Sequence, residues 1–337
     1  MDLSIGTPVD PVPPRVAAAL AAAADSPGYP QTAGTPQLRE AAARWLARRH
    51  GVCVDPGAVL PVIGTKEVIA SLPALLGCGP GDTVVYPELA YPTYEIGARL
   101  AGARAVAADG LASLGPQRVG LVWVNSPANP TGRVLPAAHL RKMADWARER
   151  NAVLASDECY LDLAWDTEPV SVLHPGVSGG SAHGLLAVYS LSKRSNLAGY
   201  RAGFLTGDPA LVAELLEVRR HAGLMMPAPV QAAMAVALDD DSGASEQRAR
   251  YAARRTRLRA ALERAGWLIE HSEAGLYLWA TRPGADCWRS VGVLAGAGIL
   301  VAPGEFYGPA GRAHIRVALT ATDERIDAAV DRLAGLG

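Results

Sequence analysis

Residues 185–193 read LLAVYSLSK, an apolar run that ends in serines and a lysine. A short apolar run bounded by polar residues is typical of a buried strand. Of the 32 lysine and arginine residues in the chain, only three are lysines. Arginine supplies positive charge equally well, whereas only an amine can lose its proton and condense with an aldehyde. Lys193 is therefore a candidate for covalent chemistry, and a solvated loop lysine is the alternative.

The apolar runs on the N-terminal side of this stretch alternate with helical patterns. We expect strands at residues 59–63, 83–86, 119–124, 153–156 and 185–190. We expect helices between them at residues 36–50, 66–76, 94–101 and 139–150. This alternation predicts an α/β fold with a large, mostly parallel sheet that helices cover on both faces. Ligands of such sheets bind at the carboxyl ends of the strands, and Lys193 follows such an end.

The pattern changes after the prolines at 227 and 229. Residues 246–264 predict a long helix rich in arginine, and short strands are expected at 276–279, 299–301 and 314–318. These elements predict a second, smaller α+β domain. The proline-rich first 28 residues are expected to lie across it. The large domain would then span 29–242, and the small domain would combine 1–28 with 243–337.

Composition excludes several classes of protein. The net charge of −1 gives no basic surface for nucleic acid. The alanine-rich run near the N-terminus is too short for a membrane span, and the pattern of a leader, a basic stretch followed by an apolar core and a cleavage site, is not expected there. The four cysteines lack metal-binding spacing and do not indicate disulfides. A cytoplasmic protein without a metal site is expected.

Two further motifs follow predicted strands. Gly64, Thr65 and Lys66 open a helix, where backbone N–H groups, a hydroxyl and an amine would suit a phosphate. An ordinary turn with a capping threonine is the alternative. The loop 125–132, NSPANPTG, could be simple turn chemistry, or it could fix the Asn129 amide over a ligand.

Asp157 ends another predicted strand, directly after the apolar residues 153–155. Its carboxylate is costly to bury unless it meets a cation, and a helix cap is the alternative. Tyr160 would contact the same ligand or simply pack, and Arg201 lies eight residues after Lys193. A condensing amine, a phosphate loop, a buried carboxylate, and amide and phenol donors are together what pyridoxal 5′-phosphate requires.

The order of these motifs resembles fold-type I aminotransferases of classes I and II, over nearly the whole chain. Four segments look like those of actinobacterial succinyldiaminopimelate aminotransferases: LSIGTPVDP (3–11), LPVIGTKE (60–67), VAPG (301–304) and VALTATDER (317–325). The resemblance implies a large domain that binds pyridoxal phosphate, a smaller α+β domain and a homodimer with shared active sites. The sequence begins almost at the 3–11 segment, without the longer N-terminal arm of many such enzymes. The resemblance therefore does not indicate which residues cover the part of the dimer surface where that arm lies.

The resemblance also implies roles for individual residues. Lys193 would hold the cofactor as a Schiff base and move the substrate proton. Asp157 would keep the ring nitrogen protonated. Tyr160 and Asn129 would bond the phenolic oxygen of the ring, and Tyr91 would stack on its face. The residues implied to hold the phosphate are Gly64, Thr65, Lys66, Ser190, Ser192 and Arg201.

Three more residues enter through the resemblance alone. Arg316 would clamp the α-carboxylate of the substrate, assisted by Asn129 and the backbone of Gly6. Tyr29 would reach the phosphate of the neighbouring subunit. The loop 223–227 lacks the arginine with which aspartate aminotransferases bind a side-chain carboxylate, and its Leu-Met-Met run is expected to suit a longer substrate.

These features predict an aminotransferase that moves the amino group of glutamate to a keto acid. The expected acceptor is N-succinyl-2-amino-6-ketopimelate, which would make the chain a succinyldiaminopimelate transaminase of lysine and diaminopimelate biosynthesis. Alternatives within the fold are a broad-specificity amino-acid aminotransferase, a β-lyase or a decarboxylase. A regulator domain that only senses the cofactor is disfavoured, since no DNA-binding domain is expected before Met1.

Overall fold

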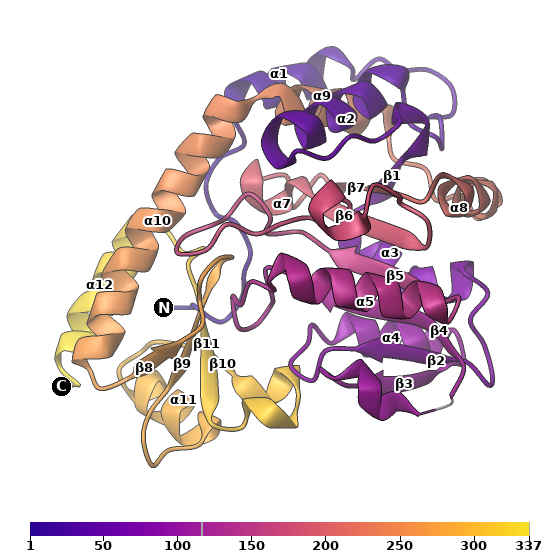
Figure 1. Cartoon of the computed structure of the whole chain (residues 1–337). Helices are drawn as coiled ribbons and strands as arrows, with labels where there is room; N and C mark the ends of the chain where they lie inside the picture. The colour runs from indigo at the N-terminus through magenta and orange to yellow at the C-terminus, as the bar shows by residue number, and fades with distance from the viewer. Residues whose placement is uncertain (116, 337) are drawn as a thin grey trace.

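The computed structural model describes residues 1–115 and 117–336. Its large domain is built on a seven-stranded sheet with the order β1-β7-β6-β5-β4-β2-β3 (Figure 1). The strands are β1 (Val59–Ile63), β2 (Thr83–Tyr86), β3 (Arg104–Ala107), β4 (Val119–Asn125), β5 (Val153–Asp157), β6 (Leu185–Ser190) and β7 (Ala202–Gly207). The strands from β6 to β3 are parallel, whereas β7 runs antiparallel to both of its neighbours. The predicted α/β class with a large, mostly parallel sheet is confirmed.

Helices cover both faces of this sheet (Figure 1). One face packs against α2 (Pro36–His50), α5 (Ala137–Glu149) and α9 (Ala228–Asp239), whose buried side chains share one apolar cluster with the strands. The other face packs against α3 (Thr65–Leu75), α4 (Thr93–Leu100) and α8 (Pro209–His221). Two short helices, α6 (Pro175–Ser178) and α7 (Leu191–Arg194), lie in loops. Burial on both faces explains why the central strands β4, β5 and β6 read as mainly apolar runs in the sequence.

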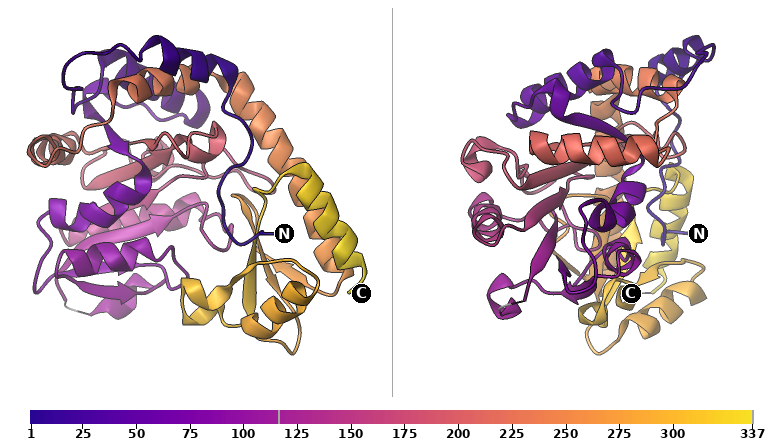
Figure 2. Two further views of the ribbon diagram at one scale, coloured as in Figure 1. Left: turned by 180° about the vertical axis from the view of Figure 1, so that it is seen from behind. Right: turned by 90° about the vertical axis from the view of Figure 1, so that its right-hand side faces the viewer.

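The second domain is a four-stranded antiparallel sheet with three helices. The sheet has the order β10-β11-β9-β8, formed by β8 (Leu268–Glu270), β9 (Tyr277–Thr281), β10 (Ala302–Pro303) and β11 (His314–Ala318). The helices are α10 (Asp241–Arg264), α11 (Cys287–Gly296) and α12 (Asp323–Ala334). Figures 1 and 2 show α12 lying alongside the long α10. Short 3-10 helices complete the chain at Pro56–Ala58, Leu111–Leu114, Gly304–Tyr307 and Pro309–Gly311.

The N-terminal segment contacts both domains. Leu3 packs in the apolar cluster of the small domain, where its backbone bonds to Leu300 and Ala318. Val16, in α1 (Pro14–Ala22), is buried in the cluster of the large domain, and α1 lies against α9. Residues 1–28 therefore do not belong to the small sheet alone. The division at residues 28 and 242 stays a prediction.

The prediction of a strand at residues 299–301 is wrong. Leu300 makes only an isolated bridge to Asp2, and the strand of this region is β10, which begins at Ala302. The backbone of Leu300 bonds to Met1 and Leu3 of the N-terminal segment, so tertiary contacts set the boundary. The apolar run itself could not show this.

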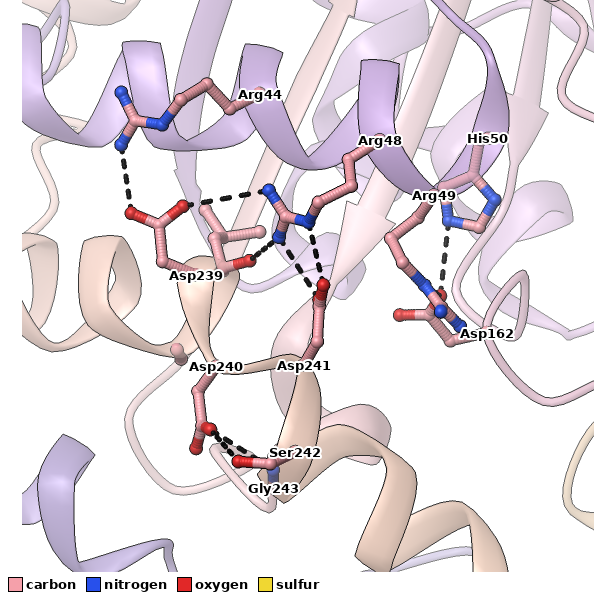
Figure 3. Close-up of polar contacts among 12 residues, drawn as sticks. Arg44, Arg48, Arg49, His50, Asp162, Asp239, Asp240, Asp241, Ser242 and Gly243 are labelled. Carbon is pink, nitrogen blue, oxygen red and sulfur yellow. Dashed lines mark hydrogen bonds and ion pairs between the residues drawn. The ribbon is translucent and has the colours of Figure 1, made fainter.

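An ionic cluster joins α2 to the start of α10 (Figure 3). Arg44 Nη2 lies 2.9 Å from Asp239 Oδ2, and Arg48 Nε lies 2.7 Å from Asp241 Oδ2. These side chains are partly exposed, so each pair contributes only about 0.2–1 kcal/mol. Together they tie the large domain to the helix that leads into the small one.

Among residues 1–115 and 117–336, no helix is long and apolar enough to cross a membrane. Over the same ranges, no three His, Cys, Asp or Glu side chains come together in a group that could hold a metal ion.

Candidate active site

A cavity of about 710 Å³ lies at the carboxyl ends of β4, β5 and β6 and extends to the small domain. It brings together twelve of the residues expected from the sequence: Gly6, Thr65, Lys66, Tyr91, Asn129, Asp157, Tyr160, Ser190, Ser192, Lys193, Arg201 and Arg316. Its other lining residues, which sequence analysis missed, are Ile5, Thr7, Ile69, Cys159, Ala198, Gly199 and Tyr277. Segments from both domains therefore form a single site.

Lys193 reaches this cavity from the short helix α7, which directly follows β6. The Ser190 side chain accepts a hydrogen bond from the Ser192 backbone and caps that helix. Lys193 Nζ donates a hydrogen bond of 2.6 Å to the Gly6 carbonyl. Burial lowers the pKa of the Lys193 amine, and the positive charge of Arg316 acts in the same direction. A lowered pKa favours the free amine that Schiff-base chemistry needs.

Asp157 ends β5 and is almost fully buried beside the cavity. Its Oδ2 accepts a hydrogen bond of 2.8 Å from the Tyr94 hydroxyl, and its Oδ1 accepts one of 3.2 Å from the Cys159 backbone. Burial raises the pKa of the Asp157 carboxyl. A cation in the cavity would favour its ionised form. Since no helix begins at Asp157, the helix-cap alternative does not apply.

Hydrogen bonds connect the loop after β4 to Arg316 on β11. Asn125 pairs with Asp157 in the β4–β5 register, and its Oδ1 accepts a 2.7 Å bond from the Asn129 backbone. Asn129 Oδ1 accepts a 2.8 Å bond from Arg316 Nη1, while Arg316 Nη2 donates to the Ser4 carbonyl at 2.6 Å. Among the described residues, the buried Nε of Arg316 has no hydrogen-bond partner. Arg316 as a residue lines the cavity, where its guanidinium can meet a ligand carboxylate.

Two tyrosines enclose the Arg316 guanidinium. Its central carbon lies 3.9 Å from the ring centroid of Tyr277 and 4.6 Å from that of Tyr307. The Tyr277 hydroxyl also lies 3.3 Å from that of Tyr160. Burial raises the pKa of Tyr160 well above its ordinary value, so its phenol stays protonated. Sequence analysis found Arg316 only by resemblance and gave no signal for either ring around it.

The opposite end of the cavity can hold a phosphate. Gly64 has a φ of +75°, and a Cβ there would lie 2.1 Å from Arg201 Nη2, so only glycine lets the guanidinium approach. Arg201 itself has a φ of +56° and is fixed by a 2.8 Å bond from Nη1 to the Ala198 carbonyl. Thr65 begins α3, and backbone N–H groups at the start of a helix suit an anion. The Cys159 thiol donates to the Thr65 hydroxyl at 3.3 Å.

Lys66 and Tyr91, two of the twelve expected residues that line the cavity, lie close to each other. Lys66 is exposed, and its Nζ lies 5.5 Å from the ring centroid of Tyr91. The amine, the buried carboxylate, the aromatic face and the phosphate cradle fit pyridoxal phosphate as a ligand. This fit rests on the kinds of donor present and on the space that Gly64 leaves.

Other expected residues lie away from the cavity. Tyr29 is 93% exposed and does not line it. Leu224 and Met226 do not line the cavity either. Met226 is instead buried in the apolar core of the large domain. The expectation that this run contacts a long substrate is not supported within one chain. Arg219, upstream of the run, is fully buried and bonds Glu67 through both terminal nitrogens at 2.8 Å, so it cannot serve as a substrate ligand.

Comparison with known proteins is consistent with this geometry. The family model described as aminotransferase class I and II matches residues 1–333. The chain is 64% identical over 334 residues to a probable aminotransferase of Mycobacterium tuberculosis, a match that covers 99% of this chain and 80% of that one. It is 62% identical over 333 residues to the 4-dedimethylamino-4-oxo-anhydrotetracycline transaminase OxyQ of Streptomyces rimosus, with 99% and 92% covered. A solved structure from Thermus thermophilus, a probable N-succinyldiaminopimelate aminotransferase, has a TM-score of 0.88 and 31% identity, with 100% and 95% covered.

Proposed function

The chain belongs to the class I and II aminotransferase family, and we propose that it moves the amino group of glutamate to N-succinyl-2-amino-6-ketopimelate. Enzymes of this family depend on pyridoxal phosphate, which when bound supplies an aldehyde that captures the amino group and a ring that accepts electrons from the substrate Cα. The observation that carries the proposal is the meeting of Lys193, Asp157 and Arg316 in one cavity.

We propose that Lys193 holds the cofactor and then moves a proton at the Cα of the substrate. Its buried amine and lowered pKa support this role, since a general base works best near the ambient pH. Asp157 would face the ring nitrogen and keep it protonated. The Tyr94 hydroxyl, fixed on Asp157 Oδ2, would orient that carboxylate.

The other contacts follow from the two ends of the cavity. Tyr160 and Asn129 would bond the phenolic oxygen of the cofactor, and Tyr91 would lie against its ring. The phosphate would be held by Gly64, Thr65, Lys66, Ser190, Ser192 and Arg201. The close approach of Arg201 to Gly64 supports this placement.

Arg316 would bind the α-carboxylate of each substrate in turn. Its guanidinium is already fixed by Asn129 and Ser4, and the side chain lines the cavity. A preorganised fork of this kind suits bidentate binding of a carboxylate. The Gly6 backbone, at the same end of the cavity, would assist.

We propose that the enzyme acts as a homodimer with shared active sites. Tyr29 is the residue that would be shared between subunits, because it is 93% exposed and does not line the cavity of its own chain. A two-fold dimer, the commonest kind of oligomer, would let it reach the phosphate of the neighbouring site.

The succinylated keto acid is favoured by the segments at 3–11 and 317–325, which resemble succinyldiaminopimelate aminotransferases, and by the 31% identical Thermus structure. The reaction would yield N-succinyl-LL-2,6-diaminopimelate and 2-oxoglutarate, a step of diaminopimelate and lysine biosynthesis. Arg219 is buried and paired with Glu67, so it is not available for the short side-chain carboxylate of aspartate, and the neighbouring Arg220 pairs with Glu217 at the surface.

A second candidate acceptor is a ring ketone of the kind that the name of OxyQ gives, and the 62% identity over nearly the whole chain favours it. Glutamate would remain the donor, so the role of Arg316 would be unchanged in that half of the reaction.

A panel of acceptors with glutamate as donor tests the proposal. We expect kcat/KM for the succinylated keto acid to exceed that for oxaloacetate by about 100-fold, or roughly 2.7 kcal/mol of transition-state binding. Comparable values for oxaloacetate or phenylpyruvate would indicate a broad-specificity aminotransferase. Turnover confined to an anhydrotetracycline ketone would favour the second candidate.

A further inference from the structure

Tyr277 lies on β9 of the small domain and is the one cavity-lining tyrosine to which no role has been given above. It is 5% exposed, and its ring meets that of Tyr160 edge to face at a centroid distance of 5.9 Å. The two hydroxyl oxygens are 3.3 Å apart. The residues on either side of it, Leu276 and Leu278, are apolar and buried. A phenylalanine would fill the same space, so the hydroxyl of Tyr277 needs its own explanation.

The same side chain touches two other parts of the site. Its ring lies against the Arg316 guanidinium at 3.9 Å. A Cβ atom on Gly6 would lie only 2.1 Å from the Tyr277 hydroxyl oxygen, so this hydroxyl packs closely against the Gly6 backbone. The carbonyl of Gly6 in turn accepts the hydrogen bond from Lys193. Tyr277 therefore links the carboxylate-binding arginine to the groups around the reacting lysine.

Proton counting fixes the direction of the bond between the two phenols. Tyr160 has one proton, which it would donate to the phenolic oxygen of the cofactor. Its own oxygen then remains as an acceptor, and the Tyr277 hydroxyl is the donor at 3.3 Å. Hydrogen bonds in such a chain polarise and strengthen one another.

We propose that Tyr277 is a positioning residue with two separable parts: its hydroxyl aims the proton of Tyr160 at the cofactor, and its ring holds the Arg316 guanidinium in place. The first part rests on the proposed contact between Tyr160 and the phenolic oxygen.

The hydroxyl is tested by Tyr277→Phe in the enzyme loaded with pyridoxal phosphate. A donor to the phenolic oxygen withdraws negative charge, so a weaker donor raises the pH at which the neighbouring Lys193 nitrogen loses its proton. We expect the midpoint of the pH-dependent absorption change to rise by about 0.5–1 pH unit, in line with the loss of one hydrogen bond. Tyr160→Phe should raise it by more.

The double variant shows whether the two phenols act in series. In the Tyr160→Phe background, Tyr277→Phe should produce no further shift, because its effect passes through Tyr160. Tyr251→Phe is the matched control, since it removes a phenol of the same apolar cluster that does not line the cavity, and it should leave the midpoint unchanged.

Two results would overturn this inference in distinguishable ways. If Tyr160→Phe shifts the midpoint and Tyr277→Phe does not, or if the two shifts simply add, Tyr277 does not act through Tyr160. If Tyr160→Phe itself causes no shift, the proposed contact of Tyr160 with the cofactor fails as well. A circular dichroism spectrum that matches the unchanged protein confirms that each variant is folded.

The ring is tested by the binding of glutarate, a dicarboxylate without an amine that occupies the site without reacting. Tyr277→Phe keeps the aromatic face and should retain the affinity. Tyr277→Leu removes it and should weaken glutarate binding by about 3- to 30-fold. Equal affinities for the Phe and Leu variants would show that the ring does not support Arg316.

Discussion

Replacement of Arg316 by lysine tests the carboxylate site while keeping its charge. Lysine offers a single ammonium group, so it cannot bond Asn129 and Ser4 and still present a second donor to the substrate. We expect the loss of one charge-assisted hydrogen bond, about 1.5–3 kcal/mol, and of the stacking between Tyr277 and Tyr307, about 0.5–2 kcal/mol. The combined effect, about 2–5 kcal/mol, is a loss of roughly 30- to 5000-fold in kcat/KM for glutamate.

The assay is a single-turnover reaction in which absorbance follows the conversion of the bound cofactor by glutamate. Most of the loss should appear as weaker saturation by glutamate, and the affinity for pyridoxal phosphate should stay unchanged. Arg312→Lys is the control, because that side chain is 78% exposed and, among the residues that the structure describes, forms an ion pair with Glu305 alone, at 3.7 Å. An Arg316→Lys enzyme within threefold of the unchanged protein would refute the assignment of the carboxylate site.

Three further predictions concern the lysine, the dimer and the acid stability of the fold. Lys193→Ala should lose the covalent attachment of the cofactor and reduce turnover by several orders of magnitude, measured by steady-state kinetics; substantial remaining activity would be evidence against its role. Mixing Tyr29→Phe with Lys193→Ala protomers should give hybrid dimers with one intact site, so activity above that of either parent is expected, and a strictly monomeric active enzyme by sedimentation would contradict the shared site. Burial alone would raise the pKa of Asp162, but the contact with His50, whose Nε2 lies 3.2 Å from Asp162 Oδ1, and the charge of Arg194 hold it well below 3.8. Its contribution to stability is therefore present above about pH 4 and is lost below it, so in urea unfolding Asp162→Asn should flatten the decline in stability between about pH 5 and pH 2; an unchanged slope would contradict this.

Much of the large domain could be predicted because its signals are local. The buried β7 (AGFLTG) carries no apolar run and was missed. The five expected strands, however, are mainly apolar runs, and the residue that follows such a strand lies at a known edge of the sheet. This places Asp157 and Lys193 close together without knowledge of any tertiary contact. The helices expected at 36–50 and 139–150 are confirmed within two residues at either end, since their apolar spacing depends only on the chain itself.

The features that sequence analysis missed depend on contacts between distant segments. Tyr277 meets Tyr160 across 117 residues, and Tyr94 meets Asp157 across 63. Arg219 pairs with Glu67, which is 152 residues away in the chain. The run at 224–226 looked like a substrate wall because it is apolar, yet Met226 is needed in the core. Local periodicity contains none of this information.

The most direct test of the account follows the nitrogen atom. Glutamate labelled with ¹⁵N is incubated with the purified enzyme, pyridoxal phosphate and the succinylated keto acid, and the products are measured by mass spectrometry. Transfer of the amino group predicts ¹⁵N-labelled N-succinyl-LL-2,6-diaminopimelate together with an equal amount of 2-oxoglutarate, which contains no nitrogen. Formation of both products should depend on Lys193. Release of ¹⁵N-labelled ammonia or of carbon dioxide, without a labelled amine product from any keto-acid or ketone acceptor, would contradict it.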